Sequence, residues 1–181
     1  MYYMFPLPSQ QTALKYLEQA SKSLNGHFIL GGHSKGGNLA VYASIFCNPE
    51  IRKRIDGVYN HDGPGFDSKV IEQSTYKSMI NKIHTYVPQS SIFGMMFEHA
   101  EEYTIVKSTQ KGFLQHDIYS WEIKRNHLET LNTMTNTSAF FDHTLTELVS
   151  DMDEQQRKAF IEGVFSLLEN TEDKTFNEIA E

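Results

Sequence analysis

A short apolar segment that runs directly into a glycine-flanked serine is the feature that most limits how this chain can fold. The segment His27-Phe28-Ile29-Leu30-Gly31 is apolar and is bounded by glycines, which predicts a buried parallel strand. Gly32-His33-Ser34-Lys35-Gly36 follows without a break, and residues 36–47 then show apolar residues at helical spacing. This order of strand, tight turn and helix is the setting of a nucleophile elbow, in which a strained backbone lifts the serine Oγ above the sheet.

The glycines of this turn are expected to have steric roles. Gly32 and Gly36 leave room where backbone must pass closely, and Gly37 lets the helix pack against its neighbours. The backbone N–H of Lys35 starts the helix and is a candidate donor to an oxyanion, helped by the helix dipole. A phosphate-binding loop is disfavoured because its Gly-x4-Gly-Lys-Ser/Thr spacing is absent. The remaining alternative is a glycine-rich turn that only joins a strand to a helix.

The rest of the chain alternates between helical and strand patterns. Helices are predicted at residues 9–25, with Ser9 as N-cap, and at about 68–82, 137–150 and 153–169. Further strands are predicted at residues 57–60, 83–87, 103–107 and 118–123. This alternation predicts an α/β fold of the α/β-hydrolase type, with a mostly parallel sheet and helices on both faces. No repeat or linker divides the chain, so we expect one domain over residues 1–181 with a helical C-terminal segment at about 137–181.

Composition narrows the class of protein and of ligand. The chain has 181 residues, of which 39% are hydrophobic, and this is enough for one hydrophobic core. A net charge of -7 argues against a nucleic acid partner, which requires clustered Lys and Arg. Cys47 is the only cysteine, no apolar run has the length of a membrane span, and residues 1–6 lack the pattern of a secretory signal, so a cytoplasmic protein is expected. No cluster of His, Cys and carboxylates has metal-binding spacing, so neither a metal nor a cofactor is expected.

The decapeptide at residues 31–40, GGHSKGGNLA, resembles the elbow of the Mbeg1-like family. That family is similar to the fungal-type (class 3) lipases of the α/β-hydrolase superfamily. Other segments that carry the resemblance are NHDGPGF at residues 60–66, YVPQSSIFG at 86–94, and QHD at 115–117 followed by Trp121. The resemblance covers about residues 8–125, and it implies an α/β-hydrolase fold and a serine hydrolase without indicating a substrate.

A serine hydroxyl becomes a good nucleophile only when a base takes its proton, and histidine has the right pKa near neutrality. Of the eight histidines, His116 is the candidate base, because it lies on a loop far downstream and before an aromatic-rich strand. The resemblance to lipases points to the same residue. The others are expected to have structural roles: His27 and His33 beside the elbow strand, His61 and His84 in or beside strands, His99 in a charged stretch, and His127 and His143 in polar surroundings.

The acid that orients the base is less well defined. In the lipases that the chain resembles, the acid usually lies in an Asp-x-Val-Pro-like stretch, but residues 87–92 contain no carboxylate. Asp62, at the end of the preceding strand, is the first candidate, and its alternative role is that of an Asp-Gly turn residue. Asp117 is adjacent to His116 and would normally point elsewhere. The third possibility is that a serine replaces the acid.

Only about 25 residues precede the elbow strand, whereas a complete α/β hydrolase has several strands there. We therefore expect an N-terminally truncated member that contains the C-terminal portion of a longer family domain. Strand 27–31 would then lie at an exposed sheet edge, through which two copies can form a homodimer. The second oxyanion donor, which normally comes from an early loop, would be missing.

Three hypotheses for function follow. The first is a lipase-type or esterase-type hydrolase acting on an acyl ester or lipid, with Ser34 as nucleophile, His116 as base, Asp62 as acid and the Lys35 N–H in the oxyanion hole. The second is a catalytically impaired or non-catalytic hydrolase-fold fragment that binds a partner or an acyl ligand. The third is a thioesterase or amidase that uses the same three side chains.

Overall fold

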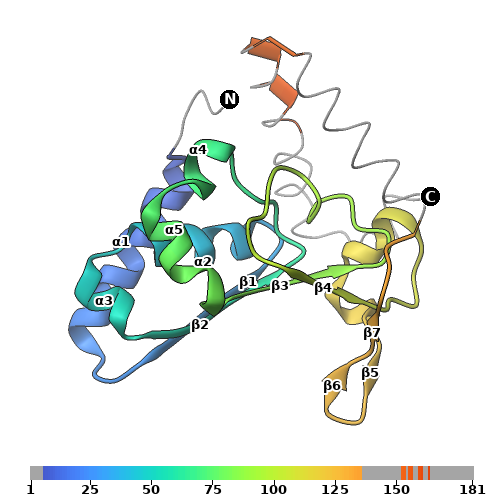
Figure 1. Ribbon diagram of the computed structural model, residues 1–181, viewed down its shortest axis with the longest axis horizontal. Coiled ribbons are helices and arrows are strands. Elements are labelled where there is room, and N and C mark those ends of the chain that lie inside the picture. The colour runs from blue at the N-terminus through green and yellow to red at the C-terminus, as the bar shows by residue number, and fades with distance from the viewer. Residues whose placement is uncertain (1–5, 136–151, 154, 157–158, 161–162, 164–181) are drawn as a thin grey trace.

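A five-stranded, mostly parallel sheet forms the centre of the molecule. The computed structural model describes residues 6–135, 152–153, 155–156, 159–160 and 163. The strand order is β1-β2-β3-β4-β7. The parallel strands are β1 (Phe28–His33), β2 (Ile55–His61), β3 (Ile83–Pro88) and β4 (Tyr103–Val106), and β7 (Thr130–Leu131) pairs antiparallel with β4. A separate ribbon of β5 (Ile123–Lys124) and β6 (His127–Leu128) projects away from the sheet (Figure 1). The predicted α/β class and mostly parallel sheet are confirmed.

The helices α1 to α5 gather on one face of this sheet (Figure 1), whereas helices are predicted on both faces. They are α1 (Pro8–Ser23), α2 (Lys35–Phe46), α4 (Ser68–Ile71) and α5 (Ser74–Met79), and the short α3 (Pro49–Lys53) connects α2 to β2. One apolar cluster fills the space beneath them, with Leu17, Val41, Val58, Tyr76 and Ile83 among its buried members. The helical segment predicted at about 137–181 lies almost entirely outside the described residues, so the single-domain organisation stays a prediction.

Alternating side chains give the sheet two different faces. Val58 and Val87 are fully buried, and Val58 belongs to the apolar cluster beneath the helices. On the opposite face, Tyr59 stacks on His84 from the neighbouring strand, with ring centroids 5.0 Å apart. The register aligns His61 with Tyr86 in the same way, and their rings are 5.5 Å apart. The structural role predicted for these two strand histidines agrees with these contacts.

The helix predicted over residues 9–25 is present, but its first residue and its cap differ. The helix begins at Pro8, and Leu7, not Ser9, is the N-cap. Proline suits the first helical position because its ring presets the backbone angle. The Gln10 side chain accepts a hydrogen bond from the Leu7 N–H at 2.9 Å, which completes the start of the helix.

The helical structure predicted at about 68–82 is present, and it is divided into α4, α5 and the 3₁₀ helix η1 (Ile80–Lys82), because the chain turns between Ile71 and Ser74. The strand predicted over 118–123 is wrong for most of its length: residues 118–120 form the 3₁₀ helix η3 (Ile118–Ser120). The Asp117 carboxylate caps η3 by accepting from the Tyr119 N–H at 3.0 Å, which stabilises a turn in place of an extended strand.

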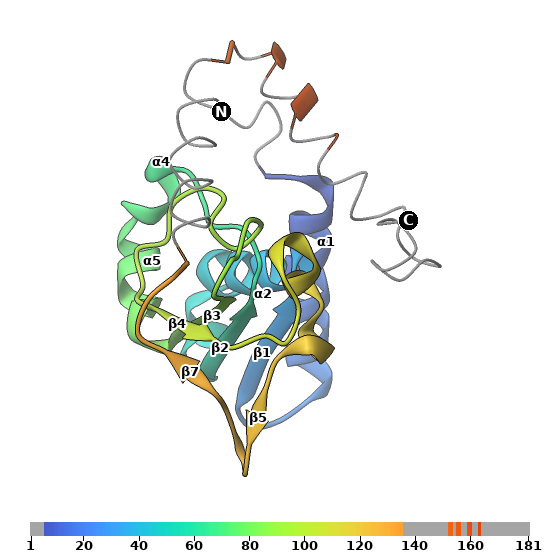
Figure 2. The same ribbon diagram turned by 90° about the vertical axis from the view of Figure 1, so that its right-hand side faces the viewer.

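The 3₁₀ helix η2 (Gly112–His116) precedes η3 and lies at the carboxyl ends of the parallel strands (Figures 1 and 2). Ligand sites of open parallel sheets lie at this end, because loops from several strands meet there. The described fold therefore brings residues far apart in the sequence, from the β1 turn to η2, to a single place.

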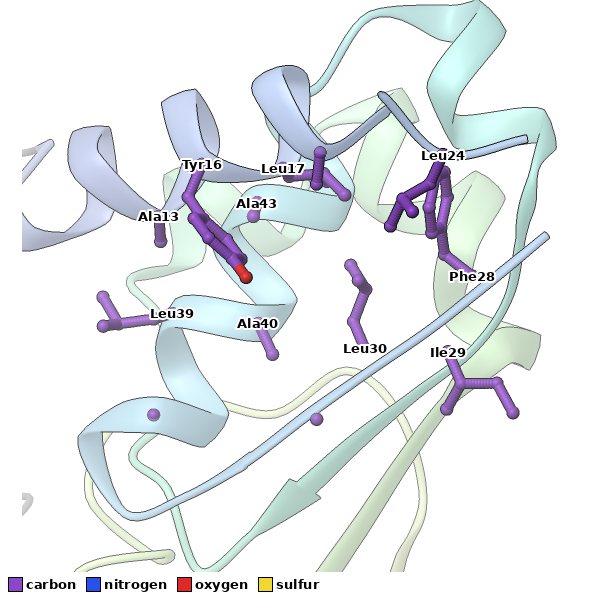
Figure 3. Close-up of a pocket in the computed structure, with 13 residues that line it drawn as sticks. Ala13, Tyr16, Leu17, Leu24, Phe28, Ile29, Leu30, Leu39, Ala40 and Ala43 are labelled. Carbon is purple, nitrogen blue, oxygen red and sulfur yellow. The ribbon is translucent and has the colours of Figure 1, made fainter. Parts of the chain in front are cut away.

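β1 pairs with β2 on one side and forms the edge of the sheet among the described residues, as predicted. The side chain of Ile29 in this strand is 71% exposed. An apolar groove of about 420 Å³ lies between α1, α2 and this edge. Figure 3 shows its lining side chains, including Tyr16, Leu17 and Leu24 with α1, Phe28 and Leu30 on β1, and Leu39 on α2.

Candidate active site

Ser34 occupies a strained turn between β1 and α2. Its backbone has φ 55° and ψ -129°, which a residue with a side chain rarely adopts. The Ser34 N–H donates to the His61 carbonyl oxygen at 2.9 Å, so the turn stays bonded to β2 until the helix begins. The Ser34 Oγ is buried and makes no hydrogen bond with any described residue. Strain of this kind at a buried polar side chain is typical of functional positions.

The glycines around Ser34 have different surroundings. A Cβ on Gly32 would overlap the backbone of Gly36, and a Cβ on Gly37 would overlap the side chain of Asn60 on β2. The steric roles expected for Gly32 and Gly37 are therefore confirmed. The expectation for Gly36 is wrong, because a Cβ there meets nothing within 4 Å. Gly36 lines the groove beside the sheet edge, and a Cβ at this position would project into open space.

Asp62 and His116 form a buried pair. Asp62 directly follows β2, whose last residue, His61, lies in register with His33. Its φ is 53°, and its N–H donates to the Tyr86 carbonyl oxygen at 2.8 Å. The His116 Nδ1–H donates to Asp62 Oδ2 at 2.7 Å, and the two side chains are 2% and 1% exposed. The structure therefore brings these two predicted site residues together, whereas the alternative acid Asp117 caps η3.

Neighbouring rings hold His116 beside the elbow. Its ring centroid lies 4.5 Å from that of His33 and 4.3 Å from that of Phe93. Burial lowers the pKa of His33, and the adjacent His116 lowers it further. His33 is therefore neutral near pH 7, and its Nε2–H donates to the His116 carbonyl oxygen at 2.6 Å. His33, expected to have only a structural role beside the strand, thus ties the His116 backbone to the residue before Ser34.

The hydrogen bond to Asp62 selects the tautomer of His116. A carboxylate only accepts hydrogen bonds, so the proton of the neutral ring lies on Nδ1 and Nε2 carries the lone pair. Both His116 Nε2 and Ser34 Oγ are buried. The Ser34–His116 hydrogen bond is not closed in this structure, because Ser34 Oγ bonds to no described residue. Such bonds commonly tighten only when substrate binds.

The N–H of Lys35 belongs to the first turn of α2, directly after Ser34. Backbone N–H groups in a first helical turn have no partner within their own helix, and the helix dipole makes this end attractive to negative charge. The geometry is therefore compatible with the role expected for Lys35 as an oxyanion donor.

Sequence reasoning missed a group of residues around Asp62. Ser91 does not replace the acid; its hydroxyl donates to Asp62 Oδ1. Gly94, His99 and Glu101 form a connected network behind it, in which His99 has a structural role of the kind expected for it. A sequence signal that can reveal such a network is a histidine two residues from a glutamate, near a glycine, in a segment that follows a buried strand.

The described residues contain no group of three or more His, Cys, Asp or Glu side chains arranged to hold a metal ion. In the same part of the chain, no helix has both the length and the apolar character that crossing a bilayer requires.

One of three comparisons with known proteins agrees with the resemblance carried by the decapeptide around Ser34. A comparison with curated proteins and one with solved structures each gave no match. A family model described as Mbeg1-like matches residues 1–166, which include Ser34, Asp62 and His116. The chain therefore belongs to the Mbeg1-like family.

Proposed function

We propose that this chain is a serine hydrolase of the lipase or esterase type that cleaves carboxylic acyl esters. The observation that carries the proposal is the buried His116–Asp62 pair, at 2.7 Å. The ring of His116 packs against the ring of His33, the residue before a serine at φ 55° on a strand-to-helix turn. A buried histidine that is hydrogen-bonded to a carboxylate and lies next to a strained serine is the arrangement required to activate a hydroxyl nucleophile.

The proposed reaction has two stages. Ser34 Oγ attacks the ester carbonyl carbon while His116 Nε2 takes the hydroxyl proton, and Asp62 stabilises the imidazolium that forms. The Lys35 N–H donates to the oxyanion of the tetrahedral intermediate. His116 then protonates the departing alcohol, leaving an acyl group on Ser34. Water, deprotonated by His116, releases the acid and restores the serine.

The apolar groove supports an acyl ester or lipid as the substrate class. Its volume of about 420 Å³ is lined mostly by Ala, Leu and aromatic side chains. It includes Gly36, two residues beyond Ser34, so it starts close to the proposed nucleophile. An apolar acyl chain that leaves water for such a surface gains about 0.8 kcal/mol for each buried CH₂. Esters with longer acyl chains are therefore the preferred substrates under this proposal.

Covalent labelling with a fluorophosphonate probe tests the proposal directly. The probe reacts with an activated serine, so we expect wild-type protein to be labelled and the Ser34→Ala variant to remain unlabelled. Ser44→Ala is the matched control, because Ser44 is fully buried in α2 and its hydroxyl donates to the Val41 carbonyl oxygen. Labelling of the wild type at the Ser34→Ala background level contradicts the proposal.

A hydrolase-fold protein that binds an acyl ligand or partner without turnover is the second candidate function. The open sheet edge and the unclosed Ser34–His116 hydrogen bond favour it. Binding of a fatty acid without fluorophosphonate labelling supports this candidate. A thioesterase or amidase with the same side chains is distinguished by comparing p-nitrophenyl esters with thioesters and amides.

Two further proposals concern the setting of the protein. The described Cys47 is a free and buried thiol, which is compatible with the reducing cytoplasm that we propose as the location of the protein.

We also propose that the exposed edge of β1 joins two copies in a homodimer. Unpaired N–H and C=O groups along an edge strand form a template for pairing with another strand.

A further inference from the structure

The two carboxylate oxygens of Asp62 have separate partners. Oδ2 accepts from His116, whereas Oδ1 accepts from the Ser91 hydroxyl and from the Gly94 N–H at 3.1 Å. The Gly94 N–H also lies 3.0 Å from Ser91 Oγ, so the three groups form one compact cluster. Hydrogen bonds to a carboxylate are among the stronger ones in proteins because the acceptor is charged. The orientation of Asp62 is thus determined from the side opposite His116.

Gly94 is held in its turn by His99. The His99 Nε2–H donates to the Gly94 carbonyl oxygen at 2.7 Å, and the Nδ1–H donates to Glu101 Oε1 at 3.1 Å. A Cβ on Gly94 would overlap Asp62 Oδ1 and crowd Val87, so this loop already lies as close to the carboxylate as a backbone can. A shift of Gly94 therefore changes the position of Asp62.

Glu101 anchors the network with a permanent negative charge. Its side chain is 2% exposed, and it accepts hydrogen bonds from Thr85 at 2.5 Å and from Tyr76 at 2.6 Å. Burial by itself would raise the pKa of Glu101, but the hydrogen bond and charge of His99, together with the two hydroxyl groups, lower that pKa to about 2. Burial and the adjacent Glu101 raise the pKa of Tyr76, so its hydroxyl remains a donor.

We propose that Ser91 and the His99–Glu101 pair are positioning residues for Asp62, which hold its Oδ1 so that Oδ2 remains on His116 Nδ1. Ser91 acts by a direct hydrogen bond, and the pair acts through the two peptide groups of Gly94. The kinetic consequence rests on the proposed hydrolase function. The effect on the Asp62–His116 hydrogen bond does not, because that bond exists whether or not the protein turns over a substrate.

The test uses two variants that reach Asp62 from different points, each with a matched control. Ser91→Ala removes the direct donor, and Ser44→Ala is the same change at a buried serine in α2. Glu101→Gln removes the charge that pairs with His99, and Glu98→Gln is the same change at an exposed position on the same loop. The first readout is the downfield proton NMR resonance of His116 Nδ1–H in the absence of substrate. The second is the separate measurement of kcat and KM on a p-nitrophenyl ester.

We expect Ser91→Ala and Glu101→Gln to broaden or abolish the downfield resonance and to lower kcat about tenfold or more, because each removes a bond to a charged group. KM should change less than about twofold, since neither residue is proposed to touch substrate. The two control variants should retain the resonance and the kcat of the wild type. A merely structural role predicts lower thermal stability with an unchanged resonance and kcat in the folded protein.

The outcomes separate this inference from the proposed function. If folded Ser91→Ala keeps the resonance of the wild type, the positioning role is wrong, whatever Glu101→Gln does. If Glu101→Gln does not fold, Ser91→Ala alone decides. If the wild type hydrolyses no ester but Ser91→Ala still loses the resonance, the hydrolase proposal fails and the positioning role stands.

Discussion

Asp62 combines two properties that are rarely found in one residue. It is an ionisable side chain with 1% exposure, and its backbone has a positive φ of 53°. A buried carboxylate needs several hydrogen bonds to offset the loss of water, and Asp62 obtains them from His116, Ser91 and Gly94. A residue held in this way has little freedom to rotate. It can therefore orient a histidine without any reorganisation of its own side chain during each turnover.

Asp62→Asn tests the identity of the acid. The change keeps the size of the side chain but replaces one carboxylate oxygen with an NH₂ group. Because NH₂ donates a hydrogen bond, the proton of His116 is no longer held on Nδ1. By the proposed mechanism, kcat on a p-nitrophenyl ester should fall by about 10³–10⁴. Asp117→Asn is the control, because Asp117 follows His116 in the sequence but only caps η3. Its kcat should stay within about twofold of the wild type, and the reverse pattern would assign the acid to Asp117.

The sequence predicts one part of this site better than the other. Ser34 and Asp62 can be placed because each directly follows a strand, and parallel strands bring their carboxyl ends together. The support behind Asp62 cannot be placed in this way. Ser91, His99 and Glu101 are contributed by an irregular segment between β3 and β4, where no periodicity indicates which side chains turn inward.

Among the secondary-structure elements, the strand–turn–helix from β1 to α2 depends on a few close backbone contacts. Gly32 lies against the Gly36 backbone, and Gly37 lies against Asn60 on β2. Asn60 is itself bonded to Gly63, with its Oδ1 accepting from the Gly63 N–H at 3.0 Å. The turn after β1 and the turn after β2 are thus packed into one unit, which sets the distance between Ser34 and Asp62.

Alanine substitutions at the two glycines of the Gly-x-Ser-x-Gly motif test which of them is required for steric reasons. Gly32→Ala places a Cβ into the Gly36 backbone and should destabilise the protein by about 1–3 kcal/mol. Gly36→Ala meets open space within α2, so it should be neutral or stabilise by up to about 1 kcal/mol through helix propensity. Urea unfolding of the two variants measures the difference. Equal destabilisation by both changes would show that a side chain is excluded sterically at Gly36 as well as at Gly32.

The secondary-structure elements that the sequence predicts well are those with one buried apolar face. The helices α1 and α2 and the strands β2 and β3 have apolar spacing that depends on one buried face, and their predicted bounds are nearly correct. Residues 118–120 contain Ile118 and Tyr119, which suit a strand, but Tyr119 is 95% exposed and the Asp117 cap determines the local structure. A local hydrogen bond outweighs strand propensity where no burial favours the strand.

At the scale of the whole molecule, the arrangement is asymmetric about the elbow strand. On one side of β1 lie the other four strands and the proposed catalytic groups, and on the other side the described residues leave an open edge and an apolar groove. Tyr16, Leu24 and Ile29 around this groove are 73%, 56% and 71% exposed. Contiguous apolar surface beside unpaired strand backbone favours association with another chain.

Ile29→Lys tests whether this edge joins two copies of the chain. A lysine within an edge strand opposes pairing because its charge would be buried against the incoming strand. We expect sedimentation velocity to show a concentration-dependent dimer for the wild type and a monomer for Ile29→Lys. Ile123→Lys is the matched control, since Ile123 is 72% exposed but lies on the β5–β6 ribbon, and this variant should still form dimers. A wild type that stays monomeric at every concentration, or a dimer that both lysines weaken equally, excludes the edge of β1 as the interface.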